Sequence, residues 1–153
     1  MKKVNTNNFK KTLSKFSTGI TVVCVKNNNS IYGKTVNSFN SLSLNPPMVL
    51  FSLGNYSSSI KKFSKTKFLS INILSSKQKK LSDNFALTEP NLEDIKFIEG
   101  KNKTVIIPNC IANLECKLID KIKKGDHIIF ICKILEVQSN DCLLYTSDAA
   151  DDP

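Results

Sequence analysis

The hydrophobic residues near the start of the chain are spaced as they are on one face of a helix. Phe9, Leu13 and Phe16 fall at positions i, i+4 and i+7, so their side chains lie together when the backbone is helical. Gly19 follows and favours the end of a helix. The pattern predicts a first helix over residues 6–17.

Further along, short runs of β-branched and other apolar residues alternate with polar turn segments, which is the pattern of strands joined by turns. We expect strands at residues 20–25, 31–36, 48–53, 68–74, 110–122 and 127–137. The last two flank residues 123–126, a turn in which Gly125 can take a positive φ. Short helices are expected after Ser57-Ser58-Ser59, whose hydroxyls suit an N-cap, and over residues 77–86.

Two segments carry many turn-forming residues. Residues 37–47 combine Asn and Ser with two prolines, which predicts a structured loop. Residues 87–109 are interrupted by Pro90, Gly100 and Pro108, which predicts a surface excursion. About six strands with short helices between them predict a mainly β, single-domain chain, folded as a closed or nearly closed antiparallel barrel.

The chain has neither a long apolar stretch nor an apolar N-terminal block. Its longest apolar runs, residues 20–25 and 128–135, are shorter than the roughly 20 residues of a transmembrane helix. The N-terminus begins with lysines and polar residues rather than a secretory signal. We therefore expect a soluble, cytoplasmic protein with no membrane partner. The five cysteines include no CxxC pair, which predicts buried, reduced thiols.

All 22 basic residues are lysines, in a chain whose formal net charge is +9. Arg is the residue that reads guanine bidentately and stacks on bases, so its absence argues against nucleic acid as a partner. We favour a solvated basic surface that attracts anionic nucleotides at long range. A Lys-rich nucleic-acid-binding barrel is the alternative, and it predicts salt-sensitive binding to oligonucleotides.

The chain offers few groups for catalysis. His127 is the single histidine, and no zinc-ligand cluster, GxSxG elbow, GxGxxG loop or GxxxxGK[ST] loop is present. These absences exclude a metal site of several histidines and argue against hydrolysis and against Rossmann or P-loop nucleotide binding. We assign no catalytic proton-transfer residue and no metal ligand.

Two polar clusters remain as candidate nucleotide ligands. One is the stretch of residues 34–41, and the other is Ser57-Ser58-Ser59 followed by Lys61 and Lys62. Hydroxyl, ammonium and helix-terminal N–H groups bind phosphate oxygens. Taken alone, however, the serines are better explained as a plain N-cap and the Asn and Ser residues as an ordinary turn.

The order of several short segments resembles the flavin reductase-like family, whose fold is the FMN-binding split barrel. The matching segments, which run from about residue 9 to 145, are Phe16-Ser-Thr-Gly-Ile-Thr-Val-Val23, Gly33-Lys-Thr-Val-Asn-Ser-Phe-Asn-Ser-Leu-Ser-Leu-Asn-Pro-Pro47, Ser57-Ser-Ser59, Phe68-Leu-Ser-Ile-Asn-Ile-Leu74, Leu81-Ser-Asp-Asn-Phe-Ala86, Leu114-Glu-Cys116 and Gly125-Asp-His127. The resemblance implies an antiparallel split β-barrel over residues 1–145. The acidic segment 146–153 matches nothing in the family and is interpreted as a truncation or an artefact of the sequence end.

The resemblance also implies a function and a site. It implies a homodimeric flavin reductase that transfers hydride from NADH or NADPH to FMN or FAD, and that could supply reduced flavin to a partner monooxygenase. The flavin ring is expected near residues 35–38, its phosphate near residues 57–59, and the nicotinamide beside His127. The residues implied to bind the flavin are Lys34, Thr35, Val36, Asn37, Ser38, Asn40, Ser41, Ser57, Ser58, Ser59, Asn84 and Phe85.

Such chemistry would explain why so few acid and base groups are present. Hydride passes between the two cofactors, so the protein has to hold the rings close and to polarise the flavin. The alternative is a non-catalytic flavin-binding protein on the same barrel, such as an electron carrier or a storage protein. Flavin retained without nicotinamide turnover would select that alternative.

Overall fold

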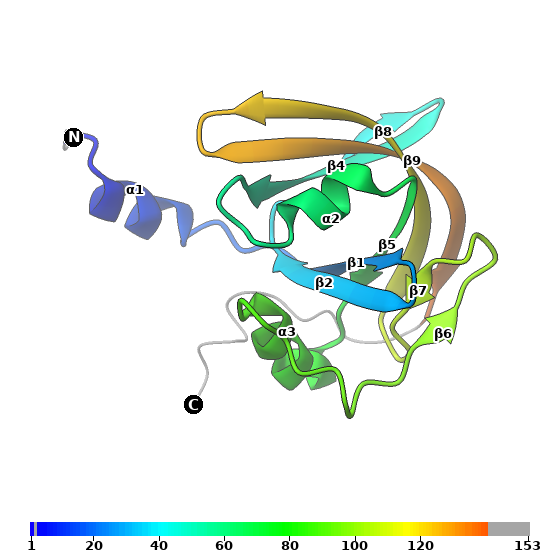
Figure 1. Cartoon of the computed structure of the whole chain (residues 1–153). Coiled ribbons are helices and arrows are strands. Elements are labelled where there is room, and N and C mark those ends of the chain that lie inside the picture. The colour runs from blue at the N-terminus through cyan, green and yellow to red at the C-terminus, as the bar shows by residue number, and fades with distance from the viewer. Residues whose placement is uncertain (2, 141–153) are drawn as a thin grey trace.

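The computed structural model describes residues 1 and 3–140, which form one strongly curved antiparallel sheet with short helices at its margins (Figure 1). The sheet has seven strands in the order β2-β1-β5-β8-β9-β4-β3. Their bounds are β1 Thr21–Asn27, β2 Ser30–Val36, β3 Asn40–Leu44, β4 Pro47–Gly54, β5 Phe68–Ile73, β8 Ala112–Lys124 and β9 His127–Ser139. A small second sheet pairs β6, Ile98–Glu99, with β7, Val105–Ile106.

The helices are short, and they differ in how they meet the sheet. They are α1 Thr6–Leu13, α2 Ile60–Lys65 and α3 Lys79–Ala86, with the 3₁₀ turn η1 Ser76–Gln78 leading into α3. Helix α3 packs on β1 and β2, whereas α1 extends away from the sheet (Figure 1). None of the helices in the described part of the chain has the length and apolar character that a membrane crossing requires.

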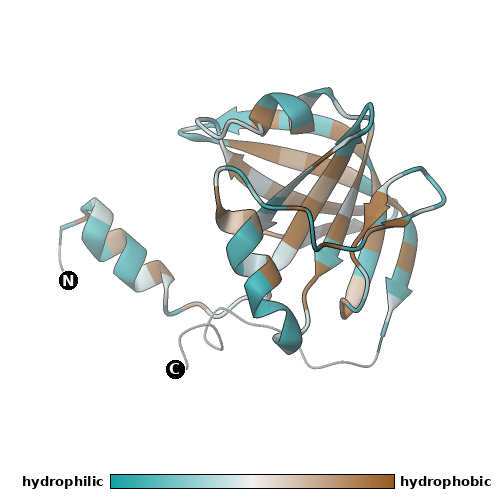
Figure 2. Cartoon of the chain, turned by 60° about the horizontal axis from the view of Figure 1, so that its bottom comes forward, coloured by the Kyte–Doolittle hydropathy of each residue, from teal (hydrophilic) through white to brown (hydrophobic). Residues whose placement is uncertain are grey.

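The barrel is split because its two edge strands, β2 and β3, each pair with only one neighbour in the sheet. The sheet nevertheless curls far enough to enclose a core, and apolar residues concentrate on the strands (Figure 2). The predicted fold class, a mainly β split barrel with short helices, is confirmed. The fully closed barrel that the strand count also allowed is not formed.

Strand β1 is buried on both faces, which explains its unbroken apolar run. Val23 and Val25 belong to the core cluster inside the barrel, where the rings of Phe51 and Phe130 stack at 5.1 Å between centroids. Val22 and the other outward residues of β1 belong to a second cluster under α3 and β7. Burial of this apolar area supplies the main driving force for the fold.

The two predicted hairpins are present. β1 pairs with β2 through the turn at residues 28–29, and β8 pairs with β9 through residues 125–126. Gly125 has φ +57°, the left-handed conformation that glycine adopts without steric cost. The last hairpin begins at Ala112, two residues later than predicted, and Cys110 packs in the second core cluster.

Three sequence predictions need correction. The helix expected over residues 6–17 ends at Leu13. Residues 37–47, expected to form a loop, contain the edge strand β3, whose polar residues face solvent and so do not show a buried pattern. Residues 87–109 were expected to lie at the surface, but Val105 and Ile107 of this segment are buried in the second core cluster.

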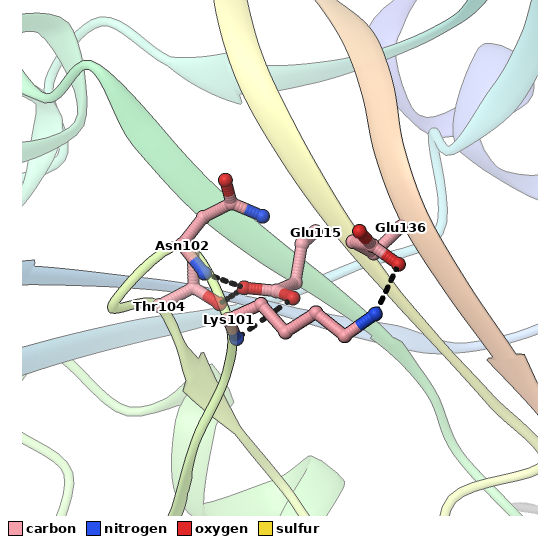
Figure 3. A network of polar contacts seen from close by, with 5 residues as sticks. All are labelled: Lys101, Asn102, Thr104, Glu115 and Glu136. Carbon is pink, nitrogen blue, oxygen red and sulfur yellow. Dashed lines mark hydrogen bonds and ion pairs between the residues drawn. The ribbon is translucent and has the colours of Figure 1, made fainter.

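Buried polar side chains fasten the segment 100–108 to the sheet. The Glu115 carboxylate accepts hydrogen bonds from the backbone N–H groups of Lys101 and Asn102, at 3.1 and 2.9 Å, and from the Thr104 hydroxyl at 2.6 Å (Figure 3). The Asn72 amide oxygen accepts from the Ile107 N–H at 3.0 Å. Each buried acceptor thus has donors, as the cost of burying polar groups requires.

The cysteines of the described residues are free and buried, as predicted: Cys24, Cys110, Cys116 and Cys132. Burial raises the pKa of Cys110 to about 11 and that of Cys132 to about 12, so both thiols are protonated at neutral pH. Cys142 lies outside the described residues. No group of three or more His, Cys, Asp or Glu residues able to hold a metal ion occurs within residues 1 and 3–140.

Candidate functional site

Three segments that are far apart in the sequence meet where β2 and β4 end. Register pairing places Gly54, the last residue of β4, opposite His127, the first residue of β9. The Asn55 N–H also donates to the Asp126 carbonyl at 2.9 Å, which joins the turn after β4 to the turn before β9. The fold therefore brings the residues after β2, the turn after β4 and the β8–β9 turn to one place.

A cavity of about 250 Å³ lies at this meeting point, and we call it the first cavity. The residues that line it are Lys34, Thr35, Val36, Asn37, Ser38, Ser52, Leu53, Gly54, Tyr56, Ser57 and His127. Both predicted clusters contribute to it, and so does the single histidine.

Hydrogen bonds fix the wall of the first cavity that follows β2. The Ser38 hydroxyl donates to the Ser52 carbonyl at 3.1 Å and accepts from the Ser52 N–H at 2.9 Å. The Thr35 hydroxyl donates to the Ser82 carbonyl at 2.6 Å, so only its oxygen lone pairs remain to meet a ligand. Asn37 lies between these two anchors and is exposed. Asn37 is therefore the side chain of this wall best placed to bind a polar ligand.

Lys34 lines the first cavity and brings a positive charge to it. Its Nζ donates to the Leu87 carbonyl at 2.6 Å, and partial burial lowers the pKa of the ammonium group. A neutral carbonyl orients the ammonium but does not compensate its charge. The arrangement leaves Lys34 suited to an anionic ligand.

His127 is half-exposed at the mouth of the first cavity. Its Nδ1 lies 2.7 Å from Oδ1 of Asp126, and this hydrogen bond, followed by the charge of the imidazole, lowers the pKa of the Asp126 carboxyl. A carboxylate partner at Nδ1 fixes the orientation of the ring and leaves Nε2 for another partner.

The three serines divide between two cavities. Ser57 lines the first cavity, whereas Ser58 and Ser59 line a neighbouring one. Ser59 occupies the N-cap position of α2 but makes no side-chain capping bond. The predicted hydroxyl cap is therefore wrong, because Ser59 has φ −78° and ψ −14° rather than the extended conformation in which a cap hydroxyl reaches the helix N–H groups.

The remaining predicted residues do not line the first cavity. Asn40 and Ser41 lie exposed on the edge strand β3. Asn84 donates to the Asn91 carbonyl at 2.7 Å and accepts from the Asn91 N–H at 3.0 Å, so it holds the segment after α3. Phe85 is fully buried against Gly33, where any Cβ would approach the ring to 2.4 Å. Their roles as ligands remain predictions.

Four lining residues were not predicted: Ser52, Leu53, Gly54 and Tyr56. They belong to the end of β4 and the turn that follows. Their sequence is typical of the end of a strand and gives no sign of a site. The hydrogen bond between Ser38 and Ser52 shows that the end of β4 faces the segment after β2.

A larger cavity, of about 900 Å³, lies elsewhere and contains none of the predicted residues. Gln78, Pro108 and Asn113 line it, as does Asn140, the last residue that the structure describes. Because chemistry and not size identifies a site, we assign the candidate site to the first cavity.

Solved flavin reductases share the fold of this chain. The chain matches the flavin reductase PheA2 with a TM-score of 0.87 and 32% identity, covering 94% of this chain and 93% of that one. It is 34% identical over 137 residues to the FMN reductase (NADH) SmoA of Agrobacterium fabrum, covering 90% of this chain and 79% of SmoA. It is also 27% identical to the reductase component of the 4-nitrophenol 4-monooxygenase/4-nitrocatechol 2-monooxygenase of Rhodococcus opacus, covering 86% of this chain and 71% of the relative.

The model of the flavin reductase like domain matches residues 13–151. The chain belongs to this family, and the resemblance seen in the sequence is confirmed. The names of the relatives agree with the predicted oxidoreductase and with flavin and NADH as its cofactors. The predicted boundary at residue 145 and the segment 146–153 lie outside the described residues.

Proposed function

We propose that the chain is a flavin reductase that transfers hydride from NADH or NADPH to FMN or FAD. The observation that carries the proposal is the convergence of residues 34–38, Ser57 and His127 on one cavity. In a chain of this family, that cavity combines groups suited to a flavin ring, a phosphate and a nicotinamide. The bound flavin supplies the hydride-accepting chemistry, and the protein supplies position and polarity.

The wall after β2 fits the polar edge of a flavin ring. Asn37 offers an amide donor and acceptor, and the Thr35 oxygen offers an acceptor. These groups would bind the pyrimidine edge and stabilise negative charge on it. The two hydrogen bonds between Ser38 and Ser52 hold the same wall in place.

The serines and Lys34 fit the anionic part of the ligand. The Ser59 hydroxyl is not used as a cap, and the ammonium of Lys34 lies beside the first cavity. Hydroxyl and ammonium donors bind phosphate oxygens through charge-assisted hydrogen bonds. We assign the flavin phosphate to the serine turn at residues 57–59.

We assign the nicotinamide to His127. The Asp126 carboxylate holds Nδ1, so Nε2 is the ring nitrogen left to form a hydrogen bond with the carboxamide. The histidine would bind and orient the nicotinamide without moving a proton in the hydride step.

Helix α1 supports the proposal of a homodimer. Phe9, Leu13 and Phe16 are 56%, 54% and 76% exposed, and no residue of α1 is buried in the single chain. Isolated helices shorter than about 12 residues are marginal in water, so α1 needs a surface to cover its apolar face. We propose a second copy of the chain as that surface. Phe9→Ser together with Leu13→Ser should convert a dimer into a monomer in light scattering, and a monomeric wild type would contradict the proposal.

Two relatives are named reductase components of monooxygenases. We propose that this chain likewise supplies reduced flavin to a flavin-dependent monooxygenase. We place it in the cytoplasm, where reduced thiols such as its four buried cysteines persist.

Anaerobic reduction of added flavin tests the proposed activity. With NADH or NADPH present, the purified protein should bleach the absorbance of FMN or FAD near 450 nm, roughly where oxidised flavin absorbs. Flavin that stays bound and oxidised with both nicotinamides would instead select the non-catalytic flavin-binding protein.

A further inference from the structure

Tyr56 is an exposed aromatic side chain at the first cavity. It lies in the turn after β4, lines the cavity and is 81% exposed. It supplies the only Phe, Tyr or Trp ring among the described residues that line this cavity. A large ring that the fold leaves in water gains free energy when a ligand covers it. Tyr56 is therefore a candidate contact for a flat ligand.

Hydrogen bonds fix the backbone that carries Tyr56. The Ser57 N–H donates to the Gly54 carbonyl at 3.1 Å, which closes a turn with Tyr56 as its third residue. The Asn55 N–H donates at 2.9 Å to the Asp126 carbonyl in the turn between β8 and β9. The ring is thus attached to a fixed part of the cavity wall.

Gly54 leaves the space in which the Tyr56 ring lies. A Cβ atom at Gly54 would lie 2.7 Å from Cε1 and 2.8 Å from Cζ of that ring. The φ angle of Gly54 is not in the left-handed region, so its backbone conformation does not by itself require glycine. The missing side chain at residue 54 therefore allows the ring to lie across the end of β4, beside the cavity.

The face of an aromatic ring distinguishes the two redox states of a flavin. That face carries negative charge density, and the oxidised isoalloxazine ring is neutral, planar and electron-poor, so the two rings stack well. A hydride carries one negative charge, so its addition to the neutral flavin at N5 leaves an anion unless a proton follows. Stacking on the negative face of Tyr56 is less favourable for this anion.

We propose that Tyr56 stacks on the isoalloxazine ring and makes the site bind oxidised flavin more tightly than reduced flavin. The inference rests on the proposed function, which places the flavin ring in the first cavity. Asn37 would stabilise negative charge at the edge of the ring, and Tyr56 on its face would limit how tightly the reduced product is held. This balance suits the proposed delivery of reduced flavin to a monooxygenase.

Two substitutions at Tyr56 test the proposal. Tyr56→Leu removes the ring, and Tyr56→Phe keeps it and is the matched control; the position is exposed, so neither change threatens the fold. FMN is titrated calorimetrically in its oxidised form and, without oxygen, after reduction with dithionite. Tyr56→Leu should weaken the binding of oxidised FMN about fivefold and that of reduced FMN less than about twofold. Tyr56→Phe should stay within about twofold of the wild type for both forms.

The potential and the fluorescence of bound FMN give independent measurements. A fivefold change in the ratio of the two dissociation constants corresponds to about 20 mV for a two-electron couple, so Tyr56→Leu should raise the potential of bound FMN by up to about that amount. A stacked phenol quenches flavin fluorescence by electron transfer, and a phenyl ring is a far poorer electron donor. Bound FMN should therefore be brighter in both variants than in the wild type.

A methyl group at residue 54 tests the position of the ring without removing it. Gly54→Ala places a Cβ where the ring lies and should displace it, which should weaken the binding of oxidised FMN about threefold. In the Tyr56→Leu background no ring is left to displace, and the same change should have less than about a twofold effect. An equal loss in both backgrounds would contradict the proposal.

The proposal is overturned if Tyr56→Leu changes the affinities for oxidised and reduced FMN equally or not at all. It is also overturned if the loss is confined to FMN and spares riboflavin, because the phenol hydroxyl would then bind the phosphate. A rise in the KM for NADH alone would place the ring against the nicotinamide and would overturn it as well. Failure of the proposed function looks different, because the wild type would then reduce no flavin with either nicotinamide.

Discussion

Two groups of polar residues in this chain differ in where their hydrogen bonds go. Around Glu115 and Asn72 the polar atoms are buried, and they bond to other protein groups that fasten the segment 100–108. Around the first cavity, Asn37 is exposed and the ammonium of Lys34 bonds to a neutral carbonyl. His127 bonds to the Asp126 carboxylate through Nδ1, which leaves Nε2 for another partner. The first group stabilises the fold, and the second is available to a ligand. The following substitutions separate these two roles.

The largest effect is expected at Glu115. Glu115→Ala removes the acceptor for two backbone N–H groups and the Thr104 hydroxyl, which should lower the free energy of unfolding by about 3 kcal/mol. Glu136→Ala is the matched control, because Glu136 pairs with exposed Lys101 at the surface (Figure 3) and should cost less than about 1 kcal/mol. Urea denaturation measures the free energy of unfolding of both variants. A loss at Glu115→Ala no larger than that at Glu136→Ala would show that the hydrogen bonds to Glu115 do not stabilise the fold.

A smaller loss of stability is expected at Asn72. Its amide joins Val22, Ile107 and Asn113, so Asn72→Ala should cost about 2 kcal/mol through unsatisfied buried groups. Asn40→Ala on the exposed strand β3 should leave the unfolding midpoint nearly unchanged. A neutral Asn72→Ala would mean that segment 104–108 is held by apolar packing alone.

Substitutions in the serine turn, residues 57–59, should weaken ligand binding and leave stability unchanged. Ser58→Ala combined with Ser59→Ala should weaken FMN or FAD binding by about 1 to 3 kcal/mol, because phosphate bonds are lost. Stability should not change, since neither hydroxyl is needed as a cap for α2. Riboflavin lacks the phosphate and serves as the control ligand; a parallel loss of riboflavin affinity would place the phosphate elsewhere.

The smallest effect is expected at His127. His127→Ala should raise the KM for NADH about fivefold, which corresponds to about 1 kcal/mol, and leave flavin affinity nearly intact. Asp126→Asn keeps a hydrogen-bond acceptor beside Nδ1 and should have a weaker effect. An equal loss of flavin and nicotinamide binding would show that the histidine serves both.

Local patterns predicted most of the sheet, because its strands are apolar runs separated by short turns. The turn at Gly125 was found for the same reason, since a glycine between two long β-rich runs leaves few other conformations. The edge strand β3 was missed because an exposed, serine-rich strand has no hydrophobic periodicity. The buried residues of segment 104–108 were missed because their partners, Asn72 and Glu115, are far away in the sequence.

The site was predicted less completely than the fold. Residues 34–38, 57 and 127 were identified as one site through family resemblance, and the structure brings them together at the first cavity. The end of β4 was not identified, because its contribution depends on register with β9 and on the bond between Ser38 and Ser52. Spatial neighbours of this kind leave no local signal in a single sequence.

The paired bonds between Ser38 and Ser52 have a consequence for affinity. They join the segment after β2 to β4, so two walls of the first cavity behave as one rigid unit before any ligand arrives. Binding then loses little conformational entropy from the protein, because the recognition surface is already in its working shape. A preorganised cavity of this kind raises the affinity for any ligand that fits it, because less of the interaction free energy is spent on ordering the protein.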